Sequence, residues 1–121
     1  MSIRDLIARR RDVTQYIAED PWTITVYRKG LSGEAESTFS FTGRIAPGLF
    51  RVSVSERVPA ILVGETGVTR QGWCIVAPYS TPVLKTRDEV KAVQGDITRL
   101  FRCINCTRYP YKIEVILEDL Q

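Results

Sequence analysis

Apolar and polar residues alternate with a period of two in several separate segments of this chain, and no other feature restricts its fold as strongly. The alternation begins at 22–28, where every second residue is predicted to share one face of a strand. It returns at 39–45, 50–54 and 112–118, and two short apolar runs, at 60–63 and 73–77, lie between turn residues. β-branched and aromatic residues are enriched in these segments, as in half-buried strands.

Short strands with turn signals about every 8 to 12 residues are typical of barrels and sandwiches. The sequence therefore predicts a mainly β fold, a small antiparallel β-barrel (or sandwich) of about six to seven strands. We favour the barrel because closure removes exposed strand edges.

The first residues follow a helical spacing instead. Ser2 and Asp5 resemble a capping box, and Asp20-Pro21 is a stop signal because a residue before proline avoids helical angles. Between them, apolar residues recur on one helical face: Ile3, Leu6, Ile7, Val13 and Ile17. We expect one domain over 1–121, with a helix at about 3–19 and a barrel at about 22–120.

The charge and the hydropathy of the chain do not indicate a particular partner. The 17 basic and 14 acidic residues are interspersed, unlike the strongly basic face of a typical nucleic-acid binder. No apolar run approaches the roughly 20 residues of a membrane helix, and charges interrupt the N-terminal apolar residues where a signal peptide would need a core. We expect synthesis in a cytoplasm and no membrane contact.

The chain contains no histidine, which excludes Ser-His and Cys-His catalysis and histidine metal ligands. Its carboxylates show no spacing that implies a shared acid/base site. We therefore predict a protein that is not an enzyme, with no catalytic residue and no cofactor.

The three cysteines offer a metal alternative. Cys103-x-x-Cys106 has the spacing of half a zinc knuckle and Cys74 is a possible third ligand, but a fourth is missing. Cys103 and Cys106 also differ in strand parity, so that one of them is predicted to point inward. We favour reduced thiols that fill space over a metal site.

Arg9, Arg10 and Arg11 form a basic cluster in the predicted helix, and Arg10 falls within its apolar face. Either Arg10 extends along the core edge with its guanidinium in water, or the helix faces another chain, where arginine pairs with carboxylate or phosphate. We assign these three arginines and Trp22 to a partner interface. A rival hypothesis is a single-stranded nucleic-acid-binding barrel that uses the arginines and exposed aromatic rings.

The order of segments resembles one family. A helix ending in Asp20-Pro21 leads into WTITVYR at 22–28, FTGRIAP at 41–47 and AILVGETG at 60–67. GWCIVAPYSTPVLKTRDEVKA at 72–92 and LFRCINCTRYPYKIEVILEDL at 100–120 follow. This order is similar to that of the small head-completion proteins, or head–tail adaptors and stoppers, of long-tailed bacteriophages.

The resemblance implies a small barrel without enzyme activity that forms a homo-oligomeric ring in the neck of the virion. Such a ring contacts portal or adaptor and tail proteins, helps to close the DNA channel, touches packaged DNA and carries the tail. In these rings a loop directed at the channel can act as a gate. The candidate channel or docking residues here lie in two glycine-containing loops, at 29–36 and 64–70: Lys29, Ser32, Glu34, Glu65, Thr66 and Arg70.

Overall fold

The protein's structure, a computed structural model, describes residues 1–29, 35–53 and 67–120 of the 121-residue chain. Within them, a single helix precedes six strands. The elements are α1 (Ile3–Glu19), β1 (Trp22–Lys29), β2 (Ala35–Ser53), β3 (Gly67–Pro78), β4 (Glu89–Gln94), β5 (Ile97–Tyr109) and β6 (Lys112–Asp119).

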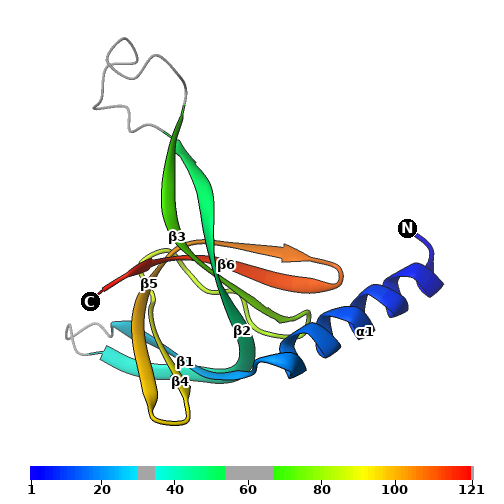
Figure 1. Ribbon diagram of the computed structural model, residues 1–121, viewed down its shortest axis with the longest axis horizontal. Helices are drawn as coiled ribbons and strands as arrows, with labels where there is room; N and C mark the ends of the chain where they lie inside the picture. The colour runs from blue at the N-terminus through cyan, green and yellow to red at the C-terminus, as the bar shows by residue number, and fades with distance from the viewer. Residues whose placement is uncertain (30–34, 54–66, 121) are drawn as a thin grey trace.

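The strands close into an antiparallel barrel in the order β1-β2-β3-β6-β5-β4, and pairing between β1 and β4 completes the circle (Figure 1). The mainly β prediction is thus confirmed, with a closed barrel rather than a sandwich. The helix predicted at about 3–19 is also confirmed. The strand predicted at 60–63 lies outside the described residues.

Alternate residues of the strands fill the interior of the barrel. Ile24 and Val26 of β1 and Ile113, Val115 and Leu117 of β6 are completely buried, as the period-two pattern predicts. Burial of each such side chain contributes about 1.5–3 kcal/mol relative to its exposure to water. Further fully or nearly fully buried side chains come from the other strands: Ile75, Ala77, Val90, Ala92, Phe101 and Cys103.

β2 changes its partner strand at Gly43. Its first part pairs with β1 as far as Trp22↔Gly43, and from Arg44↔Val76 onward it pairs with β3. A Cβ atom at Gly43 would meet Ile75 Cγ2 and the Val76 carbonyl oxygen, each at 3.0 Å. The crossing of β2 between its two partner strands therefore requires a residue without a side chain at this position.

Beyond the barrel, β2 and β3 continue as a two-stranded ribbon, which we call the hairpin arm (residues 48–53 and 67–72). The pairing of β3 with β6 begins only at Trp73, whereas β2 and β3 stay paired as far as Ser53↔Gly67. Figure 1 shows the arm rising out of the barrel wall. In the described part of the chain, both outer edges of the arm are without a neighbouring strand.

Helix α1 begins at a capped end, where the Ser2 hydroxyl accepts a hydrogen bond from the Asp5 amide at 3.1 Å. It ends where the Asp20 amide donates to the Ile17 carbonyl at 3.2 Å, just before Pro21. The helix lies against β2 and β3, and its N-terminal end points away from the barrel (Figure 1). The C-terminal end of β6 lies on the opposite side of the molecule.

Candidate assembly surface

Helix α1 is held on the barrel at its C-terminal half. Ile17 is its one buried residue, at 5% exposure. Arg44, on β2, donates through Nη1 to the Tyr16 carbonyl and to Glu19 Oε2, both at 3.0 Å, and its guanidinium lies 4.1 Å from the centre of the Tyr16 ring. One arginine of the barrel therefore fixes the last turn of the helix through three different contacts.

Arg10 attaches the middle of the helix to the same body. Its Nε donates to the Pro110 carbonyl at 3.1 Å, and its guanidinium lies 3.7 Å from the centre of the Tyr79 ring. The apolar helical face contains Arg10 because that face meets this chain's own barrel. The guanidinium therefore lies on the barrel rather than free in water, and the alternative that the helix faces another chain stays a prediction.

Arg9 and Lys112 extend this contact into a tyrosine–cation cluster. Arg9 lies 5.2 Å from the centre of the Tyr111 ring, and Lys112 Nζ lies 5.4 Å from that of Tyr109 and 5.8 Å from that of Tyr111. Burial alone would lower the pKa of Lys112, but Glu114, 2.9 Å from Nζ, outweighs burial and the pKa is raised. Lys112 therefore stays charged at neutral pH.

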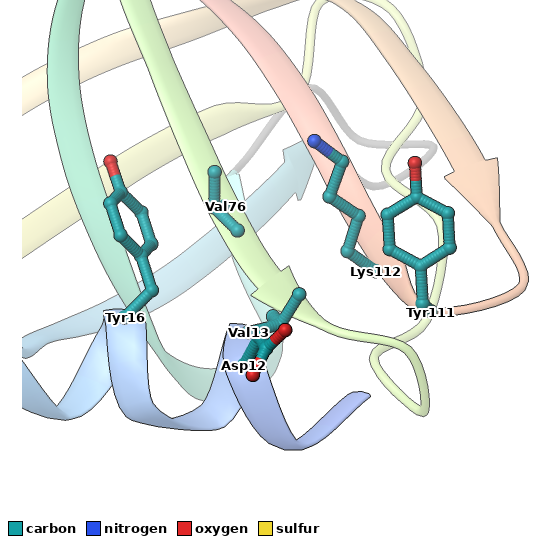
Figure 2. A pocket seen from close by; sticks show the side chains of 6 residues that line it. All are labelled: Asp12, Val13, Tyr16, Val76, Tyr111 and Lys112. Atoms are coloured by element: carbon teal, nitrogen blue, oxygen red, sulfur yellow. The ribbon is translucent and has the colours of Figure 1, made fainter. Parts of the chain in front are cut away.

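Two hollows flank the helix where it meets the barrel. The first, the Lys112 groove, has a volume of about 460 Å³ and is shown in Figure 2. The helix supplies Asp12, Val13 and Tyr16 on one side, while Val76 of β3 and the start of β6 form the other. The tyrosine–cation cluster reaches this groove through Tyr111 and Lys112.

The second hollow, the Pro21 groove, has a volume of about 400 Å³ and no charged residue in its lining: Thr14, Ile17, Ala18, Pro21, Thr42 and Pro78. Ile17 is buried, whereas Thr14, Ala18, Pro21 and Thr42 are exposed. The groove is thus an open, uncharged recess between the C-terminal half of α1 and the barrel.

The N-terminal end of α1 exposes apolar side chains. Met1, Ile3 and Ile7 are 69%, 77% and 51% exposed. Ile3 and Ile7 belong to the N-terminal half of α1, whose end points away from the barrel (Figure 1), whereas Ile17 in the C-terminal half packs onto it. A helical face of this kind is commonly covered by a partner.

The four residues predicted to form a partner interface do not share one surface. Arg9 and Arg11 are exposed on the helix, and Arg10 is half-buried against the barrel. Trp22 belongs to the hydrophobic core, with 9% exposure, because its position on β1 shares the inward face of Ile24 and Val26. The prediction that Trp22 contacts a partner is therefore wrong for this structure. Its Nε1 is buried without a hydrogen-bond partner among the described residues.

Most of the predicted channel or docking residues lie outside the described residues: Ser32, Glu34, Glu65 and Thr66. Lys29 is the last residue of β1 and pairs with Ala35 of β2. Arg70 lies in the hairpin arm, opposite Phe50. The arm was not foreseen from the sequence as a projecting ribbon, because the period-two pattern is the same inside and outside a barrel.

The cysteines lie inside the barrel or at its boundary. Burial raises the pKa of Cys103 to about 12 and that of Cys74 to about 11, with smaller contributions from Cys106 and Glu114 respectively. A bulge between Cys103 and Asn105 reverses the strand parity, and Cys106 consequently also packs against the core. The parity prediction, that one of the pair points inward, is therefore wrong. In the described part of the chain, no three potential metal ligands lie together.

A partly buried ion pair, which the sequence did not indicate, holds the segment between β3 and β4. Arg28 Nε and Nη2 donate to the two carboxylate oxygens of Asp88, at 3.0 and 2.7 Å, and the Lys85 amide donates to Oδ2 at 2.9 Å. Burial alone would raise the pKa of Asp88, but the hydrogen bonds from Arg28 and the Lys85 amide outweigh it and hold the pKa below its ordinary value. Neither residue lines the Lys112 groove or the Pro21 groove, and the pair links β1 to the residue that precedes β4.

No model of a known protein family matches this sequence, and no curated protein matches it either. Among the described residues, no helix is long and apolar enough to cross a bilayer.

Proposed function

We propose that this protein is a structural component of the neck of a long-tailed phage. It is a head–tail connector of the head-completion (adaptor or stopper) class that assembles into a ring between portal and tail. The ring helps to close the DNA channel and provides the platform on which the tail attaches. The protein performs no catalysis in this role.

The observation that carries the proposal is that two elements, α1 and the hairpin arm, project from the barrel. The apolar end of α1 extends past the barrel edge, and the hairpin arm offers two strand edges that are free in the described residues. A two-stranded ribbon is only marginally stable alone in water, and a free strand edge readily accepts another strand. Both elements suit a chain whose neighbours complete it.

The barrel interior supports the same proposal. Phe101, Ile24, Ile75, Ile113 and Leu117 are the largest of its completely buried side chains. A barrel whose interior is packed like a domain core presents its outer surface and its projections to partners. The order of segments that resembles head-completion proteins agrees with this architecture of one helix and one small barrel.

The test is to locate the protein in particles of the phage that encodes it. We expect cryo-electron microscopy to show a ring of this chain beneath the portal. Deletion of its gene should give heads without attached tails, with rescue by expression in trans. Particles that lack the protein, or normal tailed particles after deletion, would overturn the proposal.

A single-stranded nucleic-acid-binding barrel is the second candidate, and the tyrosine–cation cluster is the observation that favours it. Tyr79 is 45% exposed beside Arg10, and Arg9 lies over the Tyr111 ring, a combination of rings and cations on which bases stack in single-strand binders. It ranks second because Arg10 already covers one face of that ring at 3.7 Å. Oligonucleotide affinity that falls steeply between about 50 and about 200 mM salt would favour it over the connector.

A further inference from the structure

The two apolar features of α1 lie at opposite ends of the same helix. The exposed residues Ile3 and Ile7 lie in its N-terminal half, whose end points away from the barrel (Figure 1). The Pro21 groove lies at its C-terminal end and is floored by Ile17. One end therefore presents aliphatic side chains and the other an uncharged recess.

We infer that the N-terminal end of α1 docks into the Pro21 groove of a second copy of this chain, in a head-to-tail contact. The inference rests on the proposed function and deepens it by naming the surface through which neighbouring subunits of the ring meet. A head-to-tail contact generates a ring when the rotation between subunits closes.

Size and polarity fit this occupant. The groove of about 400 Å³ is many times the ~30 Å³ that one water molecule takes up, so it has room for aliphatic side chains. Its exposed walls are alanine, proline and threonine, without charge. Insertion of Ile3 and Ile7 would remove two exposed isoleucines from water and leave no buried charge in the lining.

The two halves of α1 carry opposite net charge, which suits a head-to-tail contact between two copies. Residues 3–11 contain four arginines and one aspartate, whereas residues 12–20 contain three acidic residues and no basic one. Arg4, Arg9 and Arg11 are exposed in the first half. In the second half Glu19 is 69% exposed, although its Oε2 already accepts a hydrogen bond from Arg44 of the same chain at 3.0 Å. The basic end of one helix therefore meets the acidic end of the next, which favours a second copy over a nucleic acid as the occupant of the groove.

Disulfide trapping of the full-length chain tests the contact. In an Ile3→Cys/Thr42→Cys variant, one thiol lies on the docking end and the other on the groove wall. Mild oxidation with diamide should give a ladder of dimers, trimers and larger species that collapses on reduction. The matched control is Ile97→Cys/Thr42→Cys, because Ile97 is 55% exposed on another part of the barrel. The single variants Ile3→Cys and Thr42→Cys, oxidised in the same way, measure any cross-linking through the native cysteines.

The inference would be overturned if no ladder formed in the Ile3→Cys/Thr42→Cys variant, or if the control gave an equal ladder. Formation of a closed dimer alone would also overturn it, because a head-to-tail contact continues to larger species. Native mass spectrometry gives a second readout. Ile3→Asp/Ile7→Asp should weaken self-association about tenfold or more without change in the circular dichroism spectrum, whereas Ile97→Asp should not.

The inference and the proposed function fail in different ways. A ladder from a protein that is absent from phage particles would leave the docking contact standing and remove the connector role. A ring of this chain in the phage neck, together with no ladder, would support the connector role and remove the docking contact. Failure of the ladder to form when a purified portal or tail protein is present during the oxidation would assign the groove to that partner instead.

Discussion

Asp88 shows how strongly one side chain can determine the connection between strands that are not neighbours in the barrel. It is 4% exposed, its carboxylate receives three hydrogen bonds, and its own carbonyl accepts from the Cys103 amide at 2.8 Å. The neighbouring Arg87 has a positive φ of 78°, an unusual conformation for a residue with a side chain, and its amide donates to the Cys103 carbonyl. The connection is thus fixed onto β5 by polar contacts.

Asp88→Asn should destabilise the protein by about 2–3 kcal/mol at neutral pH, less than a fully buried pair would lose because Arg28 is a third exposed. The folded pKa of Asp88 lies below the unfolded value of about 3.9. The stabilisation that the Asp88 carboxylate provides is therefore complete above the unfolded pKa, and it disappears as the pH falls through the folded pKa. Urea titrations at pH 7 and at about pH 3 should show the gap between the two proteins shrinking on acidification.

The control for Asp88 is Asp96→Asn, at an exposed turn between β4 and β5. It should change the free energy of unfolding by no more than about 0.5 kcal/mol at either pH. A gap between wild type and Asp88→Asn that persists unchanged to about pH 3 would contradict the assigned role of the carboxylate.

Gly43→Ala should destabilise the barrel by about 1–3 kcal/mol, because the added methyl group meets Ile75 Cγ2 and the Val76 carbonyl at 3.0 Å. Gly95→Ala is the comparison, since no atom lies within 4 Å of its Cβ position and the cost comes only from its φ of +58°. Thermal unfolding of both variants measures the difference. A Gly43→Ala protein as stable as wild type would show that β2 can shift at its crossing point.

At the scale of the element, helix α1 has little hydrophobic anchorage for its length. Ile17 is its single buried residue, and cation–π contacts and hydrogen bonds from Arg44 and Arg10 supply much of the remaining attachment. Such contacts are individually worth about 0.5–1.5 kcal/mol, so the helix is held by a few modest interactions rather than by a core.

Removal of Arg10 should therefore loosen the helix while the barrel stays folded. Arg10→Ala should cost about 1–2 kcal/mol and increase amide hydrogen exchange along α1, since it deletes one hydrogen bond and one cation–π contact. Arg11→Ala, one residue away and exposed, should leave exchange unchanged. Equal exchange in the two variants would show that Arg10 does not anchor the helix.

The strands and the helix were predictable because their periodicity is local information. The segment at 112–118 alternates in the sequence and alternates between buried and half-buried in the structure. The bulge between Cys103 and Asn105 was not predictable, because it depends on the pairing of β5 with β6 and not on either strand alone. The same holds for the change of partner at Gly43 and for the Arg28–Asp88 pair, whose members are 60 residues apart.

At the scale of the whole molecule, the candidate site was foreseen in part. The arginines of the helix were identified from the sequence, since a charge within an apolar face is visible there. The position of Arg10 under Tyr79 and Pro110 depends on how the helix crosses the barrel, which no local pattern encodes. Trp22 was misassigned for a related reason, because an aromatic residue at the start of a strand suits both a core and an interface.

The two ends of the chain lie on opposite sides of the molecule, and this decides how the protein can be labelled (Figure 1). A fluorescent protein fused before Met1 would cover Ile3 and Ile7, so we expect it to prevent self-association and give a soluble single copy. The same fusion placed after the last strand should leave self-association intact and label each copy at the side opposite the helix tip. Sedimentation velocity on the two fusions distinguishes these behaviours, and equal assembly by both would show that the helix tip is dispensable.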